Sequence, residues 1–187
     1  MSTSPVKRLI LETMWVLDKP AKAMEIAKDT GVNFPSVMMH ILGLAKSGHV
    51  EMPDKSLYVI TEKGKKMLGL PGVNKEKASE ILAYLPLEKS FHFYVDYGKP
   101  LDAHAASLQD FCEKIANVDL SSVEFHSSRG DFEAWFMGLG DVELARKALL
   151  IREQKMVGES LRRKLHDAVG SRFEELSKIR KQTDSNV

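Results

Sequence analysis

Apolar residues in the first half of the chain recur every three or four positions, which predicts helices that each bury one face. The first predicted helix spans residues 5–18 and ends before Pro20, and the second spans residues 22–30 and ends at Gly31. The inward positions expected for these two helices are Val6, Leu9, Ile10, Met14, Leu17, Met24, Ile26 and Ala27.

The stretch "NFPSVMMHILGLAKSGHV", residues 33–50, predicts a third helix. Asn33 is expected to cap it, and Pro35 suits its first turn. Gly48 is the residue expected to end it. The positions predicted to be buried are Val37, Ile41 and Leu44.

Two short apolar runs follow, "HVEM" and "LYVI", joined by "PDKS", which is the pattern of a β-hairpin. Thr61 is placed to cap a further helix, "EKGKKMLG". The predicted order of elements is therefore helix, helix, turn, helix, hairpin and helix. This order resembles the winged helix-turn-helix transcription regulators of bacteria and archaea. The residues that carry the resemblance are Ser36, Val37, His40, Ile41, Leu44, Gly48, Val50, Ile60, Thr61 and Gly64.

The resemblance implies a DNA-binding transcriptional regulator whose third helix meets double-stranded DNA. Helices that read bases usually present Arg, Lys, Asn or Gln, yet residues 33–45 contain no Lys or Arg. We therefore expect most of the affinity to come from lysines that contact phosphates. The predicted DNA-binding residues are Asn33, Ser36, Met38, Met39, His40, Lys46, Lys55, Lys63, Lys65 and Lys66.

An alternative is that these lysines are ordinary solvated surface residues. The module is then a protein-interaction domain without DNA affinity of its own, and the surface around Met38, Met39 and Leu42 makes the contact.

The second half reads as a mixture of strands and helices. Alternating Phe91, Phe93 and Val95 predict a strand over residues 90–98. The other predicted segments are a hinge and short helix within 69–84, a loop over 99–106, a helix over 107–118 capped by Ser107, a strand over 121–128, a helical turn capped by Asp131, a helical run over 141–180 weakened at Gly158 and Gly170, and a frayed tail "KQTDSNV".

These segments predict an α+β, mostly helical chain. We expect a winged helix-turn-helix domain over residues 1–70, a linker with a short helix over 71–88, and a C-terminal α/β domain over 89–187 that ends in long helices. The stretch from Phe91 to Ala145 also resembles a little-characterised archaeal domain, and that resemblance implies no known activity.

Charge and cysteine content narrow the function classes. The 187 residues carry a net charge of +1, and residues 1–70 hold ten Lys and Arg against seven Asp and Glu, which is +3. That sign favours the first half as the part that meets an anion. The one cysteine excludes an internal disulfide and a cysteine-based zinc cluster, and no apolar run approaches the ~20 residues of a membrane span. We expect a cytoplasmic protein.

Catalytic and metal-binding patterns are weak. His92, His104 and His126 lie near acidic residues in the sequence, but their spacing matches no metal motif, so we expect no metal and no cofactor. Cys112 lies on the apolar face of a predicted helix, which favours a core role over a nucleophile. No phosphate loop or nucleophile elbow is present, and we expect no enzyme activity.

Dimers are the usual form of winged-helix regulators, so a homodimer is expected. The C-terminal domain would supply dimerisation, sensing of an effector that the sequence does not name, or partner contact. For its long final helix two roles remain possible: the helix covers the domain's own sheet, or it forms the contact between two copies of the chain. A lesser alternative is a small-molecule pocket in this domain, lined by Tyr94, Tyr97, Phe132 and Trp135.

Overall fold

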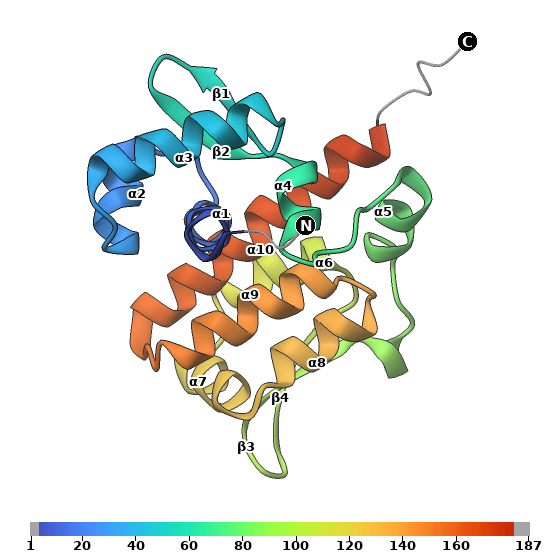
Figure 1. The fold of residues 1–187 in the computed structure, drawn as a ribbon. Helices are drawn as coiled ribbons and strands as arrows, with labels where there is room; N and C mark the ends of the chain where they lie inside the picture. The colour runs from blue at the N-terminus through green and yellow to red at the C-terminus, as the bar shows by residue number, and fades with distance from the viewer. Residues whose placement is uncertain (1–3, 182–187) are drawn as a thin grey trace. The chain divides into compact units, whose positions relative to one another are not determined.

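The computed structural model describes residues 4–181 (Figure 1). The chain is α+β and mostly helical, with two small antiparallel sheets. It divides into two compact units, Met1–Gly72 (unit 1) and Val73–Val187 (unit 2). None of the described helices combines the length and the apolar character that crossing a bilayer requires. The tail predicted to fray is residues 181–187: Lys181 still belongs to the final helix, and residues 182–187 lie outside the described part of the chain.

Unit 1 packs three helices together and continues into a hairpin and a short helix. Trp15, Ile26 and Ile41 are buried and form part of the core between these helices. Two predicted inward positions are wrong: Met24 is 61% and Leu9 40% exposed. The elements are α1 (Pro5–Leu17), α2 (Ala23–Thr30), α3 (Phe34–Lys46), β1 (Val50–Asp54), β2 (Leu57–Ile60) and α4 (Glu62–Met67).

The start of α3 confirms the sequence prediction. The Asn33 side chain accepts a hydrogen bond from the Ser36 N–H, and a proline lies in the first turn. The three apolar positions predicted to face inward are fully buried. After α3, β1 pairs with β2, and Ala21 exchanges two backbone hydrogen bonds with Tyr58 on the other side of β2. A short segment between α1 and α2 is thereby joined to the hairpin.

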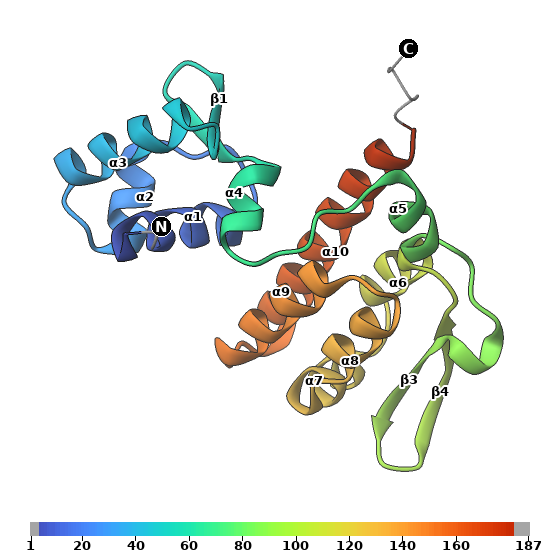
Figure 2. The same cartoon turned by 45° about the vertical axis from the view of Figure 1, so that its right-hand side comes forward.

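Unit 2 surrounds a long final helix. Helices α5, α6, α7 and α9 all pack against α10. Figure 2 shows the β3–β4 hairpin beside α7 and α8, with its turn projecting beyond them. The elements are α5 (Lys75–Ile81), the 3-10 helix η1 (Leu87–Lys89), β3 (Phe91–Asp96), β4 (Lys99–Ala105), α6 (Leu108–Ile115), α7 (Leu120–Arg129), α8 (Asp131–Gly138), α9 (Val142–Glu153) and α10 (Gly158–Lys181).

The predicted strand over residues 121–128 is wrong, because this segment is the helix α7. The Asp119 side chain accepts from the Ser121 N–H at 2.9 Å and caps the helix, and Gly130 ends it in the left-handed conformation. The buried positions 122, 123, 126 and 127 follow a helical period. Two of the four are serines, so an apolar pattern does not reveal the period.

The predicted loop over residues 99–106 is also wrong, because it contains β4. Ala105 pairs with Phe91, and His104 pairs with His92. The inward residues of β4 are Leu101, Ala103 and Ala105, and alanine is uncommon in strands, so the alternation is easily taken for a loop. Pro100 lies opposite Tyr94 at an irregularity in the register, where a missing N–H is tolerated.

The final helical run is two helices. The chain leaves helical geometry after α9, and Lys155 and Gly158 both have positive φ angles, 52° and 65°. The Gly158 N–H donates to the Glu124 carboxylate at 2.7 Å, which fixes the start of α10 against α7. The predicted weak point at Gly158 is therefore confirmed, whereas α10 continues through Gly170.

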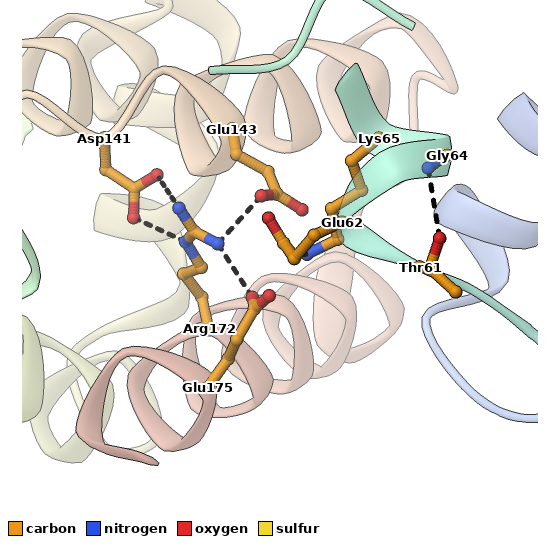
Figure 3. A network of polar contacts seen from close by, with 8 residues as sticks. All are labelled: Thr61, Glu62, Gly64, Lys65, Asp141, Glu143, Arg172 and Glu175. Carbon is orange, nitrogen blue, oxygen red and sulfur yellow. Dashed lines mark hydrogen bonds and ion pairs between the residues drawn. The ribbon is translucent and has the colours of Figure 1, made fainter. Parts of the chain in front are cut away.

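A buried ion network joins α9 and α10 in unit 2 (Figure 3). Arg172 is 2% exposed and donates to both carboxylate oxygens of Asp141, at 2.8 and 3.0 Å. Its Nη1 donates to Glu143 at 2.8 Å and to Glu175 at 2.7 Å. Burial alone would lower the pKa of the guanidinium, but these carboxylates outweigh it and raise that pKa, so Arg172 stays charged.

Candidate functional site

Two regions of the structure bear on function: the end of α3 with the hairpin in unit 1, and a cavity in unit 2. The sequence predicts the first as a DNA-binding surface.

The polar residues at the start of α3 are partly occupied by the helix itself. The Oδ1 atom of Asn33 accepts the Ser36 N–H at 3.0 Å, so this oxygen serves the cap. Ser36 and His40 are only half-buried, and the side chain of Asn33 is exposed. The three polar residues predicted to meet bases are therefore accessible, but they offer few donors and acceptors to a base edge.

The outward face of α3 is apolar. Met39 is 62% and Leu42 56% exposed, while Met38 is half-buried. A Cβ atom added at Gly43 would meet nothing within 4 Å, so the helix presents a flat backbone patch beside Leu42. Such a face can contact a thymine methyl but discriminates poorly between base pairs.

Basic side chains gather at the other end of α3 and at the hairpin tip. Lys46, Lys55, Lys63 and Lys66 are exposed, and none of them forms an ion pair within the described residues. Lys65 differs, because its ammonium pairs with Glu62 at 3.3 Å and its side chain is 12% exposed. Exposed Glu51 and Asp54 on β1 offset part of the positive charge.

The pKa of His49 reflects the positive charge near the end of α3. Burial lowers the pKa of His49, and the positive charges of Lys63 and Lys7 lower it further. Its Nδ1 lies 2.7 Å from the Ser47 hydroxyl. The Lys63 ammonium donates to the Ser47 carbonyl at 2.8 Å, so this lysine also hydrogen-bonds the C-terminal end of α3.

Thr61 and Gly64 hold the hairpin against the end of α3. The Thr61 hydroxyl donates to the Gly48 carbonyl at 2.7 Å. It also accepts from the Gly64 N–H at 3.2 Å (Figure 3). A Cβ atom at Gly64 would lie 2.3 Å from the His49 carbonyl oxygen. Sequence reasoning finds the Thr61 cap but misses the close approach at Gly64, because only the packing of two distant segments creates it.

A cavity of about 340 Å³ lies in unit 2 between the β3–β4 hairpin, α7 and α8. Three of the four aromatic residues predicted to line a pocket do so, namely Tyr94, Tyr97 and Trp135. Phe132 instead lies in the core, 1% exposed. Other lining residues are missed by the sequence reasoning: Phe125 lies in the segment predicted as a strand, and Arg129 follows that segment directly.

His126 and Asp131 form the polar wall of this cavity. The Nδ1 atom of His126 lies 2.7 Å from Asp131 Oδ2, and its Nε2 accepts the Tyr94 N–H at 2.8 Å. These two bonds fix the neutral tautomer that carries its proton on Nδ1. The His126 side chain is thus buried, 4% exposed, with both ring nitrogens in contact with partners. The prediction that Asp131 caps α8 is wrong, because its carboxylate instead binds His126 and the Arg129 Nε, the latter at 2.9 Å.

Acid should weaken unit 2 through His126. Burial lowers its pKa below 6.5 and outweighs the opposing effect of Asp131, so the unfolded chain binds this proton more readily than the folded one. The stabilisation is complete above pH 6.5 and is lost as the pH falls through the lowered folded pKa. Urea unfolding followed by Trp135 in a Trp15→Phe chain should show this loss between about pH 7 and about pH 5. His126→Gln should flatten the pH dependence, and an equally steep dependence in that variant would contradict the assignment.

The three histidines that lie near acidic residues in the sequence, His92, His104 and His126, do not converge. His92 and His104 stack across the hairpin with ring centroids 5.8 Å apart, while His126 is committed to Tyr94 and Asp131. Among residues 4–181, no group of three or more His, Cys, Asp or Glu side chains is placed to hold a metal ion. Burial is the main cause that raises the pKa of the half-buried Cys112 thiol, which keeps it protonated and poorly nucleophilic.

Comparisons with known proteins leave the geometry as the guide to function. No protein-family model, no curated protein and no solved structure matches the chain.

Proposed function

We propose that unit 1 is a winged helix-turn-helix module that binds double-stranded DNA mainly through the phosphate backbone, in a regulator of transcription. The order of its helices supports this, together with the hairpin that follows α3 and the backbone pairing of Ala21 with Tyr58 beside it. In this proposal, unit 2 supplies the regulatory part, which is dimerisation, sensing or partner contact.

The observation that carries the proposal is the set of exposed lysines at the end of α3, at the hairpin tip and on α4. Lys46, Lys55, Lys63 and Lys66 are accessible and are not neutralised by an acidic partner within the described residues. Lysine ammonium groups bind phosphate as point charges and carry no sequence information. The apolar outward face of α3 adds little base discrimination, so the binding is expected to be weakly selective.

Binding to a random-sequence duplex should depend on salt as about four phosphate contacts require. The logarithm of the affinity should fall with the logarithm of the salt concentration with a slope of about −3 to −4, which is roughly a hundredfold between about 50 and 200 mM salt. Fluorescence anisotropy of a labelled duplex with the full chain measures this slope. The absence of binding at low salt would overturn the proposal.

Paired variants test which lysines contribute. Lys46→Gln with Lys55→Gln should reduce the salt slope by about 2, since each removes one phosphate contact. Lys178→Gln, an exposed lysine on α10, is the matched control and should leave the slope unchanged. Lys65 is a poor probe because its loss also breaks the pair with Glu62. Met39→Ala should leave the affinity for DNA unchanged.

The exposed apolar face of α3 favours a second candidate, a module that joins two copies of this chain. Met39 and Leu42 expose more than half of their side chains on a helix that meets no other element on that side of unit 1 among the described residues. Methionine suits adaptable contacts. Sedimentation of the full chain should then give a dimer that Leu42→Lys dissociates, and a monomer in the parent chain would eliminate this candidate.

A further inference from the structure

The cavity between the β3–β4 hairpin, α7 and α8 has the form of a small-ligand site. Its volume of about 340 Å³ lies at the lower end of the range usual for such sites. Aromatic rings form much of its wall: Tyr94 and Tyr97 from the hairpin, Phe125 from α7 and Trp135 from α8. The Trp135 Nε1–H already donates to the Lys89 carbonyl at 3.1 Å, so this residue offers the cavity an apolar ring. A ligand with a planar ring fits such walls.

Arg129 is the cation of the cavity, and its neighbours hold it in one orientation. Its Cζ atom lies 4.6 Å from the Tyr97 ring centre and 4.9 Å from the Phe125 ring centre. Its Nε donates to Asp131 at 2.9 Å, and Asp131 is itself held by His126 at 2.7 Å. Nε serves Asp131 and the side chain also has a hydrogen bond with Tyr97, so the N–H groups of the two Nη atoms beyond that bond are the donors for a carboxylate.

The charges around the cavity limit the ligand to a single negative charge. Asp131 balances Arg129, and Asp96 is paired with Lys99 at 3.0 Å. The lining therefore holds two carboxylates and one guanidinium, with the Lys99 ammonium at its margin. A phosphate or a polyphosphate would place two or more negative charges beside these carboxylates, which like-charge repulsion disfavours.

We propose that this cavity binds a small aromatic monocarboxylate, with the ring against the aromatic wall and the carboxylate on the Nη edge of Arg129. The proposal is independent of DNA binding by unit 1, because every residue it uses lies in unit 2. The Asp131–His126 pair acts as a positioning device for Arg129, and it carries out no chemistry on the ligand.

Titration of the ¹⁵N-labelled full chain with sodium benzoate tests the proposal. The Trp135 Nε1–H and Arg129 Nε–H signals should shift in a saturable way with a Kd on the order of 1 mM, as expected for a ligand of this size. Neutral benzamide should bind at least about tenfold more weakly, because it lacks the charge that Arg129 recognises. The dianion phenyl phosphate should also bind more weakly than benzoate.

Variants separate recognition from folding. Arg129→Gln should weaken benzoate binding by about tenfold or more and leave benzamide unchanged. Arg152→Gln is the matched control, because Arg152 is likewise a surface arginine of unit 2 that pairs with a carboxylate, Glu133, and it does not line the cavity. The backbone spectrum of each variant shows whether unit 2 is folded. Should Arg129→Gln lose its fold, Tyr97→Leu replaces it, and at 75% exposure Tyr97 is not a core residue.

Three outcomes would overturn the proposal. One is the absence of a saturable shift at benzoate concentrations about ten times the expected Kd. Another is equal binding of benzamide, which would make Arg129 irrelevant. The third is tighter binding of phenyl phosphate than of benzoate, which would assign the cavity to phosphorylated ligands.

Discussion

Arg172→Met should lower the free energy of unfolding of unit 2 by about 3–5 kcal/mol, the largest effect expected from a single substitution in this chain. Methionine fills a similar volume but carries no charge. Asp141, 1% exposed, would then lose the guanidinium that neutralises it and retain the hydrogen bond from the Leu144 N–H. Removing the counter-ion of a buried carboxylate costs more than the loss of the hydrogen bonds themselves.

The measurement is urea unfolding followed by Trp135 fluorescence in a Trp15→Phe background, since the chain has two tryptophans, one in each unit. Arg163→Met, an exposed arginine on the same helix, is the control and should change the stability by less than about 0.5 kcal/mol. A deficit that is small at neutral pH would show that the network contributes little.

Gly64→Ala should destabilise unit 1 by roughly 3 kcal/mol. The added Cβ would lie 2.3 Å from the His49 carbonyl oxygen and 2.6 Å from the Ile60 Cγ1 atom. The first of these is a backbone atom, so the clash is relieved only if α4 moves away from the turn after α3. That movement also breaks the bond from the Thr61 hydroxyl to Gly48.

Gly43→Ala is the matched control for Gly64→Ala. Both glycines lie in helices, but nothing lies within 4 Å of a Cβ at Gly43, so alanine there should stabilise α3 by about 0.5–1 kcal/mol. Trp15, 1% exposed in unit 1, reports the unfolding of both variants in a Trp135→Phe background. Equal stabilities for the two variants would mean that α4 does not pack as closely as described.

The sequence predicts the elements of unit 1 better than those of unit 2, because the signals in unit 1 act between residues that are close in the sequence. Caps such as Asn33 and Thr61 act within three residues, and the buried positions of α3 repeat within one helix. In unit 2, the register of β4 depends on pairing with β3, and two of its three inward residues are alanines, which are uncommon in strands. Helix α7 buries serines against the sheet, which no apolar pattern indicates.

The residues of the candidate sites likewise fall into those that the sequence predicts and those that it does not. The accessibility of Lys46 and Lys55 follows from their positions at a helix end and a hairpin tip, which the sequence predicts. The pairing of Lys65 with Glu62 follows from side-chain direction, and the position of Arg129 beside Tyr97 needs the chain fold. The histidine contacts of Asp131 are likewise tertiary, and a helix cap is the simpler local expectation for an aspartate after Gly130.

The pairing of Ala21 with Tyr58 has a consequence for the aggregation behaviour of unit 1. It occupies one side of β2, and β1 occupies the other, so within the described residues of this unit the open hydrogen-bonding edge belongs to β1. That edge carries Pro53, which lacks an N–H, between the exposed charges of Glu51 and Asp54. Proline and charge on an edge strand oppose the addition of a further strand. The hairpin is therefore protected against edge-to-edge pairing with other chains, and association through unit 1 is left to its helices.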